Sequence, residues 1–291
     1  MTSKAKTSIK VRRFCLSWLL RCLGAVTRRI HPRVIQRALR YFHPSKQVII
    51  NATVRMRNGL DVLVDTGDHV GWSLFFLGEY EPGIVRMLGR LLEHGDTAID
   101  VGAHIGVHTL SMARATRGRV IALEPNPLLK ERLERNVRVN DLRNVTVIQR
   151  AALDHAHPVA LHIPPSETRN EGMSSLIPLG GWPSQIVQGT TLNELMVELD
   201  LGRVGLVKID VEGLEPAVLT GARGLIARDH PALLFEYSRD YWLRAAFDLG
   251  EVLESLRDAG YQHFAIVEDD RTFPLNDRLP EYANICATVG P

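Results

Sequence analysis

The stretch from Thr97 to Glu124, TAIDVGAHIGVHTLSMARATRGRVIALE, predicts a strand, a glycine turn, a helix and a second strand. Ala98 to Val101 is a short, mostly apolar run that stops at Gly102, which is typical of a buried strand and too short for a helix. The helix that begins near Val107 directs its free N–H groups and its partial positive charge into the turn. Arg119 to Leu123 is the second strand. The stretch therefore predicts a strand–helix–strand unit whose turn suits a ligand.

The spacing of the turn favours one cofactor over another. A dinucleotide site uses G-x-G-x-x-G, whose glycines let a pyrophosphate reach the helix N-terminus. Here Asp100 precedes Gly102 and Gly106, and an acidic residue at that place repels phosphate but suits a cation. Glu124, 18 residues after Gly106, is placed to accept both hydroxyls of an adenosine ribose. The pattern favours S-adenosylmethionine, which carries a sulfonium, over NAD; an ordinary strand–helix turn without a nucleotide is the alternative.

The rest of the chain alternates strand-like and helical segments. Further strands are expected at residues 145–150, 159–163, 204–211, 231–237, 261–268 and 284–289, and further helices at 84–93, 127–139, 191–200, 215–223 and 248–260. Capping signals, among them the box formed by Thr191 and Glu194, support the helix starts. This alternation predicts a doubly wound, mostly parallel α/β sheet with an antiparallel end strand.

Two segments outside that alternation have their own signals. Asn58 and Gly59 separate two apolar runs and predict a β-hairpin ahead of the main sheet. Residues 164–184 are rich in Pro, Gly, Ser and Asn and show no periodicity. A loop of that length in a compact domain is usually functional or mobile.

The charge of the chain is unevenly distributed. The 291 residues have a formal net charge of +2, yet residues 1–60 hold 14 Lys and Arg and no Asp or Glu. The remaining residues hold 21 basic and 33 acidic side chains. We therefore expect a basic arm at 1–45 and one α/β domain at 46–291. Cys15, Cys22 and Cys286 show neither zinc nor disulfide spacing, which favours a reducing, cytoplasmic location.

The arm carries a helical stripe of apolar residues: Val11, Phe14, Cys15, Trp18, Leu19, Cys22, Leu23 and Val26. With Arg21 inside it, the run is too short for the ~20 residues of a membrane span. We expect residues 10–28 either to lie on an anionic membrane surface, at the cytoplasmic face, or to pack on the protein or a partner. An organellar presequence is a third alternative.

Four segments of the chain resemble one family: GDTAIDVGAHIGVHTL, VIALEPNP, VGLVKIDVEGLEPAVLTGA and PALLFEYS. The chain resembles the FkbM-type S-adenosylmethionine-dependent methyltransferases from about Asp68 to Val289. His104 stands where the family usually has Asn. The resemblance implies a seven-stranded, Rossmann-like class I methyltransferase sheet and a small-molecule, sugar or glycolipid acceptor. It also implies that Glu81 helps to line the cofactor cleft.

Acidic residues stand where the predicted strands end: Asp100, Glu124, Asp210 and Glu236. Ligands of doubly wound sheets bind beyond these carboxyl ends. The predicted cofactor-binding residues are Glu81, Asp100, Gly102, Ala103, His104, Gly106, Glu124, Asp154 and Asp210. Asp154 is expected on the adenine side, and a surface turn is its alternative.

Methyl transfer to oxygen needs a base that takes the hydroxyl proton. Because side chains alternate along a strand, Asp210 and Glu212 share one side, and with Glu236 from the next strand they are the predicted catalytic acids. The imidazole of His104 or His108 is an alternative base. Burial and neighbouring acids would raise the pKa of such a carboxylate and improve it as a base.

Other interpretations of the same residues remain open. Lys208 could pair with Asp210 or Glu212 as a structural ion pair. The three predicted catalytic acids could instead hold magnesium, which is less favoured because no further ligand stands out, so no metal ligand is assigned. Rival functions are an RNA methyltransferase, disfavoured because no aromatic stacking platform is seen, and a non-catalytic binding or scaffold module.

Overall fold

The computed structural model describes residue 26 and residues 50–165, 171–178, 180–269, 271–275 and 280–290. These residues belong to two units, Met1–Tyr80 and Glu81–Pro291. Apart from Val26, which is helical and exposed, the predicted arm lies outside the described residues. Among the residues that are described, no helix has the length and apolarity needed to cross a membrane. The boundary at residue 45 and the role of the arm therefore remain predictions.

The first unit contains the predicted hairpin. β1 (Asn51–Arg55) pairs antiparallel with β2 (Asp61–Asp65) around Asn58 and Gly59, which confirms the turn signal. Gly59 has a φ of 83°, a conformation that glycine adopts without a Cβ clash. The Met56 N–H donates to the Leu60 carbonyl at 2.8 Å and closes the turn.

A helix that the sequence pattern did not predict follows the hairpin. α3 (His69–Leu77) begins after Asp68, whose carboxylate accepts the N–H of Gly71, and ends at Gly78 in the left-handed region. Its sequence is apolar on nearly all sides, so it has no amphipathic period to detect. A Cβ at Gly71 would lie 1.9 Å from the Asp65 carbonyl oxygen, so this helix approaches β2 as only a glycine allows.

The second unit is built on one sheet of eight strands. In spatial order they are β13 (Thr272–Pro274), β12 (His263–Val267), β14 (Tyr282–Thr288), β11 (Ala232–Ser238), β10 (Val204–Ile209), β3 (Thr97–Val101), β4 (Val120–Leu123) and β5 (Val145–Ile148). β11, β10, β3, β4 and β5 are parallel, which confirms the predicted doubly wound, mostly parallel sheet.

The C-terminal strands differ in detail from the expectation. The antiparallel strand, β14, is last in the chain but inserts between β11 and β12. The eighth strand, β13, was not predicted because three residues are too few to show an alternating pattern. β13 forms one edge of the sheet, and its Pro274 has no N–H to offer a further strand.

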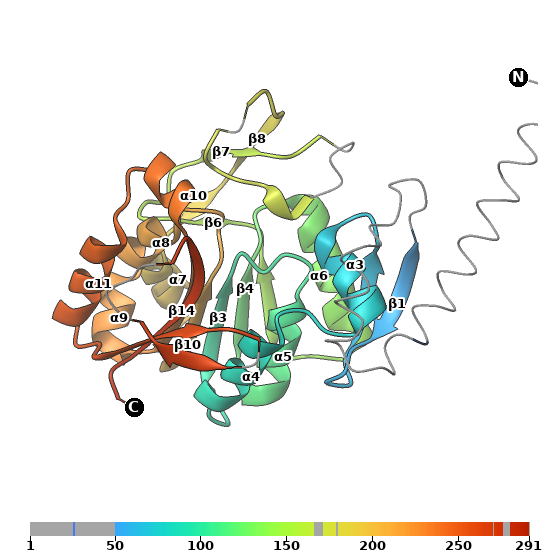
Figure 1. The fold of residues 1–291 in the computed structure, drawn as a ribbon, viewed down its shortest axis with the longest axis horizontal. Coiled ribbons are helices and arrows are strands. Elements are labelled where there is room, and N and C mark those ends of the chain that lie inside the picture. The colour runs from blue at the N-terminus through green and yellow to red at the C-terminus, as the bar shows by residue number, and fades with distance from the viewer. Residues whose placement is uncertain are drawn as a thin grey trace, which may run out of the picture. The chain divides into compact units, whose positions relative to one another are not determined.

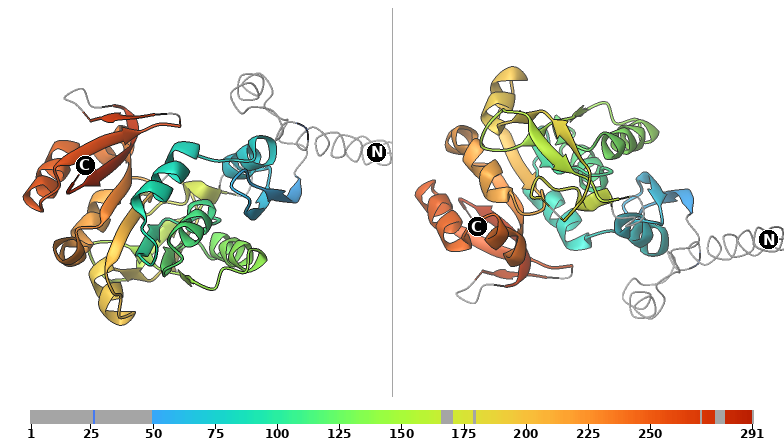
Figure 2. Two further views of the ribbon diagram at one scale, coloured as in Figure 1. Left: turned by 90° about the horizontal axis from the view of Figure 1, so that it is seen from below. Right: turned by 90° about the horizontal axis from the view of Figure 1, so that it is seen from above.

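Helices cover both faces of this sheet (Figure 2). On one face lie α4 (Pro82–Leu91) and α5 (Val107–Thr116); on the other lie α7 (Leu192–Glu198), α8 (Glu215–Gly221), α9 (Arg223–Asp229) and α11 (Leu249–Asp258). α6 (Pro127–Val139) packs against β5, and α10 (Arg239–Arg244) follows β11. α8 corresponds to the predicted helix at 215–223, and α9, which was not predicted, follows it.

The alternation of side chains along the strands separates the two cores. In β3, Ala98 faces α4 and α5, while Ile99 packs in the larger core on the opposite face. In β10, Leu206 and Val207 divide in the same way. Asp100 and Lys208, two positions after Ala98 and Leu206, therefore lie on the same face of the sheet as α4, close to the carboxyl ends of their strands.

The segment between β5 and α7 contains small elements. β6 (Ala151–Ala152) pairs with β9 (Gly189–Thr190), and β7 (Val159–His162) forms a hairpin with β8 (Ser184–Val187) that stands apart from the large sheet (Figure 1). The predicted loop at 164–184 includes a short 3₁₀ turn, Glu171–Met173. β8 and β9 were not predicted from the sequence.

Two adjacent residues of α4 test how its packing stabilises the second unit. Leu88 is fully buried against the sheet, so Leu88→Ala should lower the free energy of unfolding by about 2–5 kcal/mol. Gly89 is exposed and a Cβ there would meet nothing, so Gly89→Ala should raise it by about 0.5–1 kcal/mol. Urea denaturation followed by circular dichroism measures both. Equal effects would contradict the assigned faces of α4.

Candidate functional site

The glycine turn after β3 is shaped by the neighbouring strand. Gly102 has a φ of 78°, and a Cβ there would lie 1.8 Å from the carbonyl oxygen of Asp210, just after β10. The Asp210 N–H donates to the Val101 carbonyl at 3.0 Å, which holds the two chain segments together. Gly106, with a φ of 93°, caps α5. The packing of the two chain segments therefore requires a glycine at position 102. A side chain at this position would disturb the fold as well as the binding of a ligand.

Glu124 lies at the end of β4 and organises this turn. One carboxylate oxygen accepts the backbone N–H of His104 and the other accepts that of Asn126, both at 2.8 Å. Each oxygen keeps a further lone pair for a ligand. Burial raises the pKa of Glu124 to about 7. The carboxylate predicted to hold a ribose is thus fixed in orientation by the chain itself.

The backbone explains why histidine can replace asparagine in the turn. His104 has a φ of 53°, in the left-handed region. Asn, Asp and His are enriched there among residues with a side chain. The substitution therefore preserves the backbone of the turn, and the imidazole is the part that differs from the family pattern.

Five carboxylates gather beyond the strand ends and form what we call the acid group: Glu81, Asp100, Asp210, Glu212 and Glu236. Asp210 interacts electrostatically with each of the other four. They come from the start of α4, from β3, from the loop after β10 and from β11. The structure thus brings together three acids that the sequence predicted at separate strand ends, Asp100, Asp210 and Glu236, and adds Glu81 and Glu212 to them.

Lys208 provides positive charge inside the acid group. Its Nζ lies 3.2 Å from Asp210 Oδ2 and 3.6 Å from Asp100 Oδ1, and Lys208 and Asp100 are neighbours in register on β10 and β3. Burial alone would lower the pKa of Lys208, but the nearby carboxylates raise it above its ordinary value. The alternative in which Lys208 pairs with Asp210 therefore describes part of the site.

Glu212 and Glu236 have strongly raised pKa values, and neither forms a salt bridge with a described residue. Burial, followed by repulsion from Asp210, raises the pKa of Glu212 to about 8. Glu212 sits in a left-handed turn, with a φ of 58°. The same two causes raise the pKa of Glu236, whose Oε1 accepts the hydroxyl of Tyr282 at 2.7 Å. Such groups can hold a proton near neutral pH.

Glu81 joins the acid group from the start of α4. Its Oε2 lies 3.4 Å from His108 Nε2, and it accepts a hydrogen bond from Asn284. Burial raises the pKa of Glu81 to about 7, and burial, followed by Lys208, lowers the pKa of His108 well below its usual range. His108 is therefore a neutral imidazole at physiological pH.

Glu215 is a fully buried acid that no sequence pattern identified as a site residue. Its Oε1 accepts the N–H groups of Val211 and Gly213, and its Oε2 accepts Trp242 Nε1 at 2.8 Å. These bonds fix the loop that presents Glu212. An acid in the first turn of a helix, directly after a glycine loop, is the sequence signal that could have identified it.

The described part of the predicted functional loop borders this site. Ser174 Oγ accepts Asn126 Nδ2 at 3.0 Å, next to Glu124. A Cβ at Gly213 would lie 3.2 Å from Ile177 Cδ1, so the loop also approaches the turn that carries Glu212. Residues 174–177 thus lie close to both halves of the site.

Asp154 is not drawn into the acid group. Its side chain is exposed, and its Oδ1 lies 3.8 Å from His155 Nε2. A cofactor role for Asp154 remains a prediction. Among the residues that the structure describes, no group of three His, Cys, Asp or Glu side chains could hold a metal ion.

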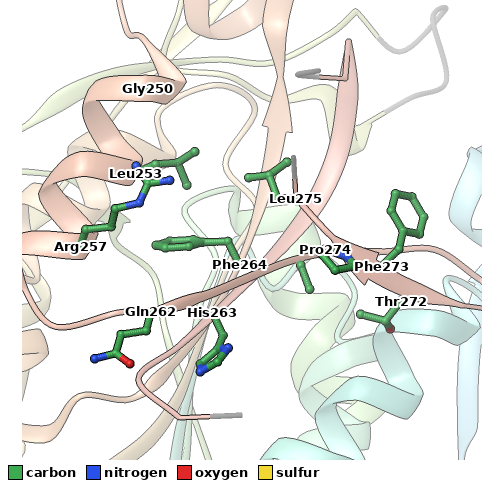
Figure 3. A pocket seen from close by; sticks show the side chains of 11 residues that line it. Gly250, Leu253, Arg257, Gln262, His263, Phe264, Thr272, Phe273, Pro274 and Leu275 are labelled. Carbon is green, nitrogen blue, oxygen red and sulfur yellow. The ribbon is translucent and has the colours of Figure 1, made fainter. Parts of the chain in front are cut away.

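A separate hollow of about 600 Å³ lies between α11 and the β12–β13 hairpin. Figure 3 shows Phe264 pointing toward α11, where Leu253 and Arg257 line the same space, and the Arg257 guanidinium lies 5.3 Å from the Phe264 ring centre. None of the predicted site residues lines this hollow.

Comparison with known proteins adds evidence from outside the chain. The sequence model of the methyltransferase FkbM domain matches residues 100–263. The hexuronic acid methyltransferase AglP of Haloferax volcanii is 30% identical over 141 residues, which are 48% of this chain and 56% of that protein. The chain therefore matches little more than half the length of this relative.

Solved structures show more distant likeness. The methyltransferase FkbM of Methylobacillus flagellatus has a TM-score of 0.45 and 16% identity, over 74% of this chain and 52% of that one. A putative methyltransferase of Streptococcus mutans in complex with SAH has a TM-score of 0.43 and 10% identity, over 70% and 94% of the two chains.

The acid group predicts an unusual dependence of stability on pH. The folded-state pKa values of Glu81, Glu124, Glu212 and Glu215 are raised from 4.5 to about 7 or 8, so the folded state keeps protons that the unfolded state loses. Stability should therefore fall as pH rises from 6.5 to 8. The lowered pKa of His108 opposes this fall in the lower part of the interval, because the unfolded imidazole, with an ordinary pKa of 6.5, is still partly protonated there, but one imidazole is outweighed by four carboxyl groups.

Thermal or urea denaturation at several pH values between 6.5 and 8 measures this slope. Glu212→Gln removes one of the titrating groups and should make the slope shallower. Asp141→Asn, which changes an exposed carboxylate in a turn, is the matched control and should leave it unchanged. Stability that rises over the interval in the wild-type protein would contradict the raised pKa values.

Proposed function

The chain belongs to the methyltransferase FkbM domain family, and we propose that it transfers a methyl group from S-adenosylmethionine to a hydroxyl oxygen of a carbohydrate. One observation carries the proposal: the glycine turn after β3, the carboxylate of Glu124 and the acid group lie together beyond the carboxyl ends of parallel strands. This is where doubly wound sheets bind nucleotides.

The residues of the turn fit the proposed cofactor. Glu124 would accept the ribose hydroxyls, and the turn from Gly102 through Ala103 and His104 to Gly106 would lie against the nucleoside. S-adenosylmethionine supplies an electrophilic methyl group on a positively charged sulfur. Asp100 is fully buried, its Oδ1 lies 3.6 Å from Lys208 Nζ, and it belongs to a group with more negative than positive side chains. Such a group favours a sulfonium over a phosphate.

We assign the proton transfer to the same acids. As the acceptor oxygen bonds to the methyl carbon and the carbon–sulfur bond breaks, the hydroxyl proton must go to a base. Asp210 is paired with Lys208, whereas Glu212 and Glu236 have raised pKa values, which suit a group that takes up a proton near neutral pH. Glu212 is the first candidate, with Asp210 and Glu236 beside it and His104 as the alternative.

The acceptor class rests on one relative. Because AglP carries the name of a hexuronic acid methyltransferase, a sugar acid is the first acceptor to test. Neutral sugars, glycolipids and other small hydroxyl compounds are the remaining candidates. A peripheral membrane position through residues 10–28 would bring the enzyme to glycolipid acceptors, and this too is a proposal.

Cofactor binding is tested by calorimetry with S-adenosylmethionine. Glu124→Gln removes the charge that strengthens the ribose hydrogen bonds, worth about 1.5–3 kcal/mol, and leaves one of the backbone N–H groups of His104 and Asn126 without its acceptor, so affinity should fall ~10-fold or more. Asp141→Asn again serves as the control. Unchanged affinity in Glu124→Gln would remove Glu124 from the cofactor site, and a wild-type protein that binds no S-adenosylmethionine would support the scaffold alternative.

Catalysis is tested by transfer of labelled methyl groups to glucuronosides and neutral glycosides. Glu212→Gln and Asp210→Asn each remove a proton acceptor, so turnover should fall by ~10²–10⁴. Glu212→Gln should leave affinity for S-adenosylmethionine nearly unchanged. Loss of wild-type activity on adding a chelator would favour the magnesium alternative. If both variants turn over at the wild-type rate without metal dependence, the base must be sought at His104.

A further inference from the structure

A small hollow of about 100 Å³ lies between α4 and the β12–β13 hairpin. Three arginines line it: Arg86 and Arg90 from the helix and Arg271 from the hairpin. Glu268 is the carboxylate that lines it. The volume corresponds to about three water molecules, enough for a small polyatomic group. We call these four side chains and the space between them the arginine hollow.

Arg86 and Arg90 extend from the same side of α4. Arg86 and Arg90 are four residues apart, so they lie one above the other on the same helix face. Both are exposed, and neither makes a salt bridge or hydrogen bond with any described residue. Two guanidinium groups with no carboxylate partner thus face the same hollow.

The third arginine is held in place by its own contacts. Arg271 Nε donates to Glu268 Oε2 at 2.9 Å, and its guanidinium lies 5.2 Å from the centre of the Phe273 ring. A Cβ at Gly83 would lie 2.1 Å from the Glu268 carbonyl oxygen, so α4 and the hairpin meet backbone to backbone. The two walls of the hollow are therefore kept at a fixed separation.

Charge identifies the kind of ligand. The lining side chains, three guanidinium groups and one carboxylate, have a net charge of +2. Asp269, the next acid along the chain, does not line the hollow and interacts electrostatically with Glu81. A phosphate monoester carries about −1.5 to −2 at pH 7 and presents three strong acceptor oxygens, which match the planar donor fork of arginine. A carboxylate brings half of that charge. We propose that the arginine hollow is a second binding site, which takes a phosphate monoester group.

This site is distinct from the proposed cofactor site. α4 begins next to Glu81, a member of the acid group, and its ten residues span ~15 Å. None of the acid group lines the hollow, and Arg86 and Arg90 follow Glu81 by five and nine residues along the helix. The ordinary alternative is that Arg90 stabilises the C-terminal end of the helix dipole and that both helical arginines are simply solvated.

Calorimetry on the full chain at low ionic strength, with inorganic phosphate and with glucose 6-phosphate, tests the proposal. The wild-type protein should bind both saturably, and the double variant Arg86→Gln with Arg90→Gln should bind at least 10-fold more weakly. Arg138→Gln, an exposed arginine in the last turn of α6, is the control and should behave as the wild type. Circular dichroism and binding of S-adenosylmethionine verify that the double variant is folded.

A second arm separates a soluble phosphate ester from a lipid headgroup. Vesicles of phosphatidylcholine with and without phosphatidic acid are compared for the wild type and the double variant. If the wild type binds vesicles that contain phosphatidic acid and the double variant does not, the phosphate monoester that the hollow binds is a lipid headgroup. The proposal is overturned if the double variant binds all three probes as the wild type does, if no probe binds, or if acetate binds as tightly as inorganic phosphate.

Discussion

The buried ammonium of Lys208 is the interaction on which the rest of the site depends. The ammonium lies between the carboxylates of Asp100, on β3, and Asp210, which directly follows β10. The lysine is almost inaccessible to solvent. Taking such charges out of water is costly, and the cost is offset only where the partners stay close. Without this cation, the carboxylates of the acid group would repel one another in a poorly solvated place. The ion pairs therefore make it feasible to concentrate acids beyond the strand ends.

The position of that lysine follows from the architecture of the sheet. Its strand is buried on both faces, so apolar side chains fill one core and most of the other. The charged residues of β3, β10 and β11 are Asp100, Lys208 and Glu236, and each stands near the carboxyl end of its strand. The sheet is doubly wound and mostly parallel, with β14 inserted antiparallel between β11 and β12. This insertion places Tyr282 and Asn284 beside the acid group.

The chain carries two regions of opposite charge on one helix. The start of α4 contributes Glu81 to the acid group, while Arg86 and Arg90 line a hollow against the β12–β13 hairpin. The hairpin is held against the helix at Gly83, where only a glycine fits. A ligand bound at the acid group and a ligand bound in the arginine hollow would therefore both contact residues of α4 or its first turn.

Local signals in the sequence determined the parts of the fold that depend on neighbouring residues. The capping box at Thr191 and Glu194 and the turn at Asn58 and Gly59 are both present, because their hydrogen bonds span only a few residues. The parallel strands were visible as apolar runs, and the acids at their ends followed from the direction of the strands. The family segments supplied Glu81, which no periodicity would have identified.

Tertiary structure alone decided the partners that come from distant segments. The sequence could not show that Gly102 must accommodate the Asp210 backbone, that Glu215 binds Trp242, or that Tyr282 donates to Glu236. It also could not show the insertion of β14, because strand order depends on long-range pairing rather than on local pattern. Residue type and spacing determine which groups a strand end presents, whereas their pKa values and partners depend on burial and on distances that exist only once the sheet has formed.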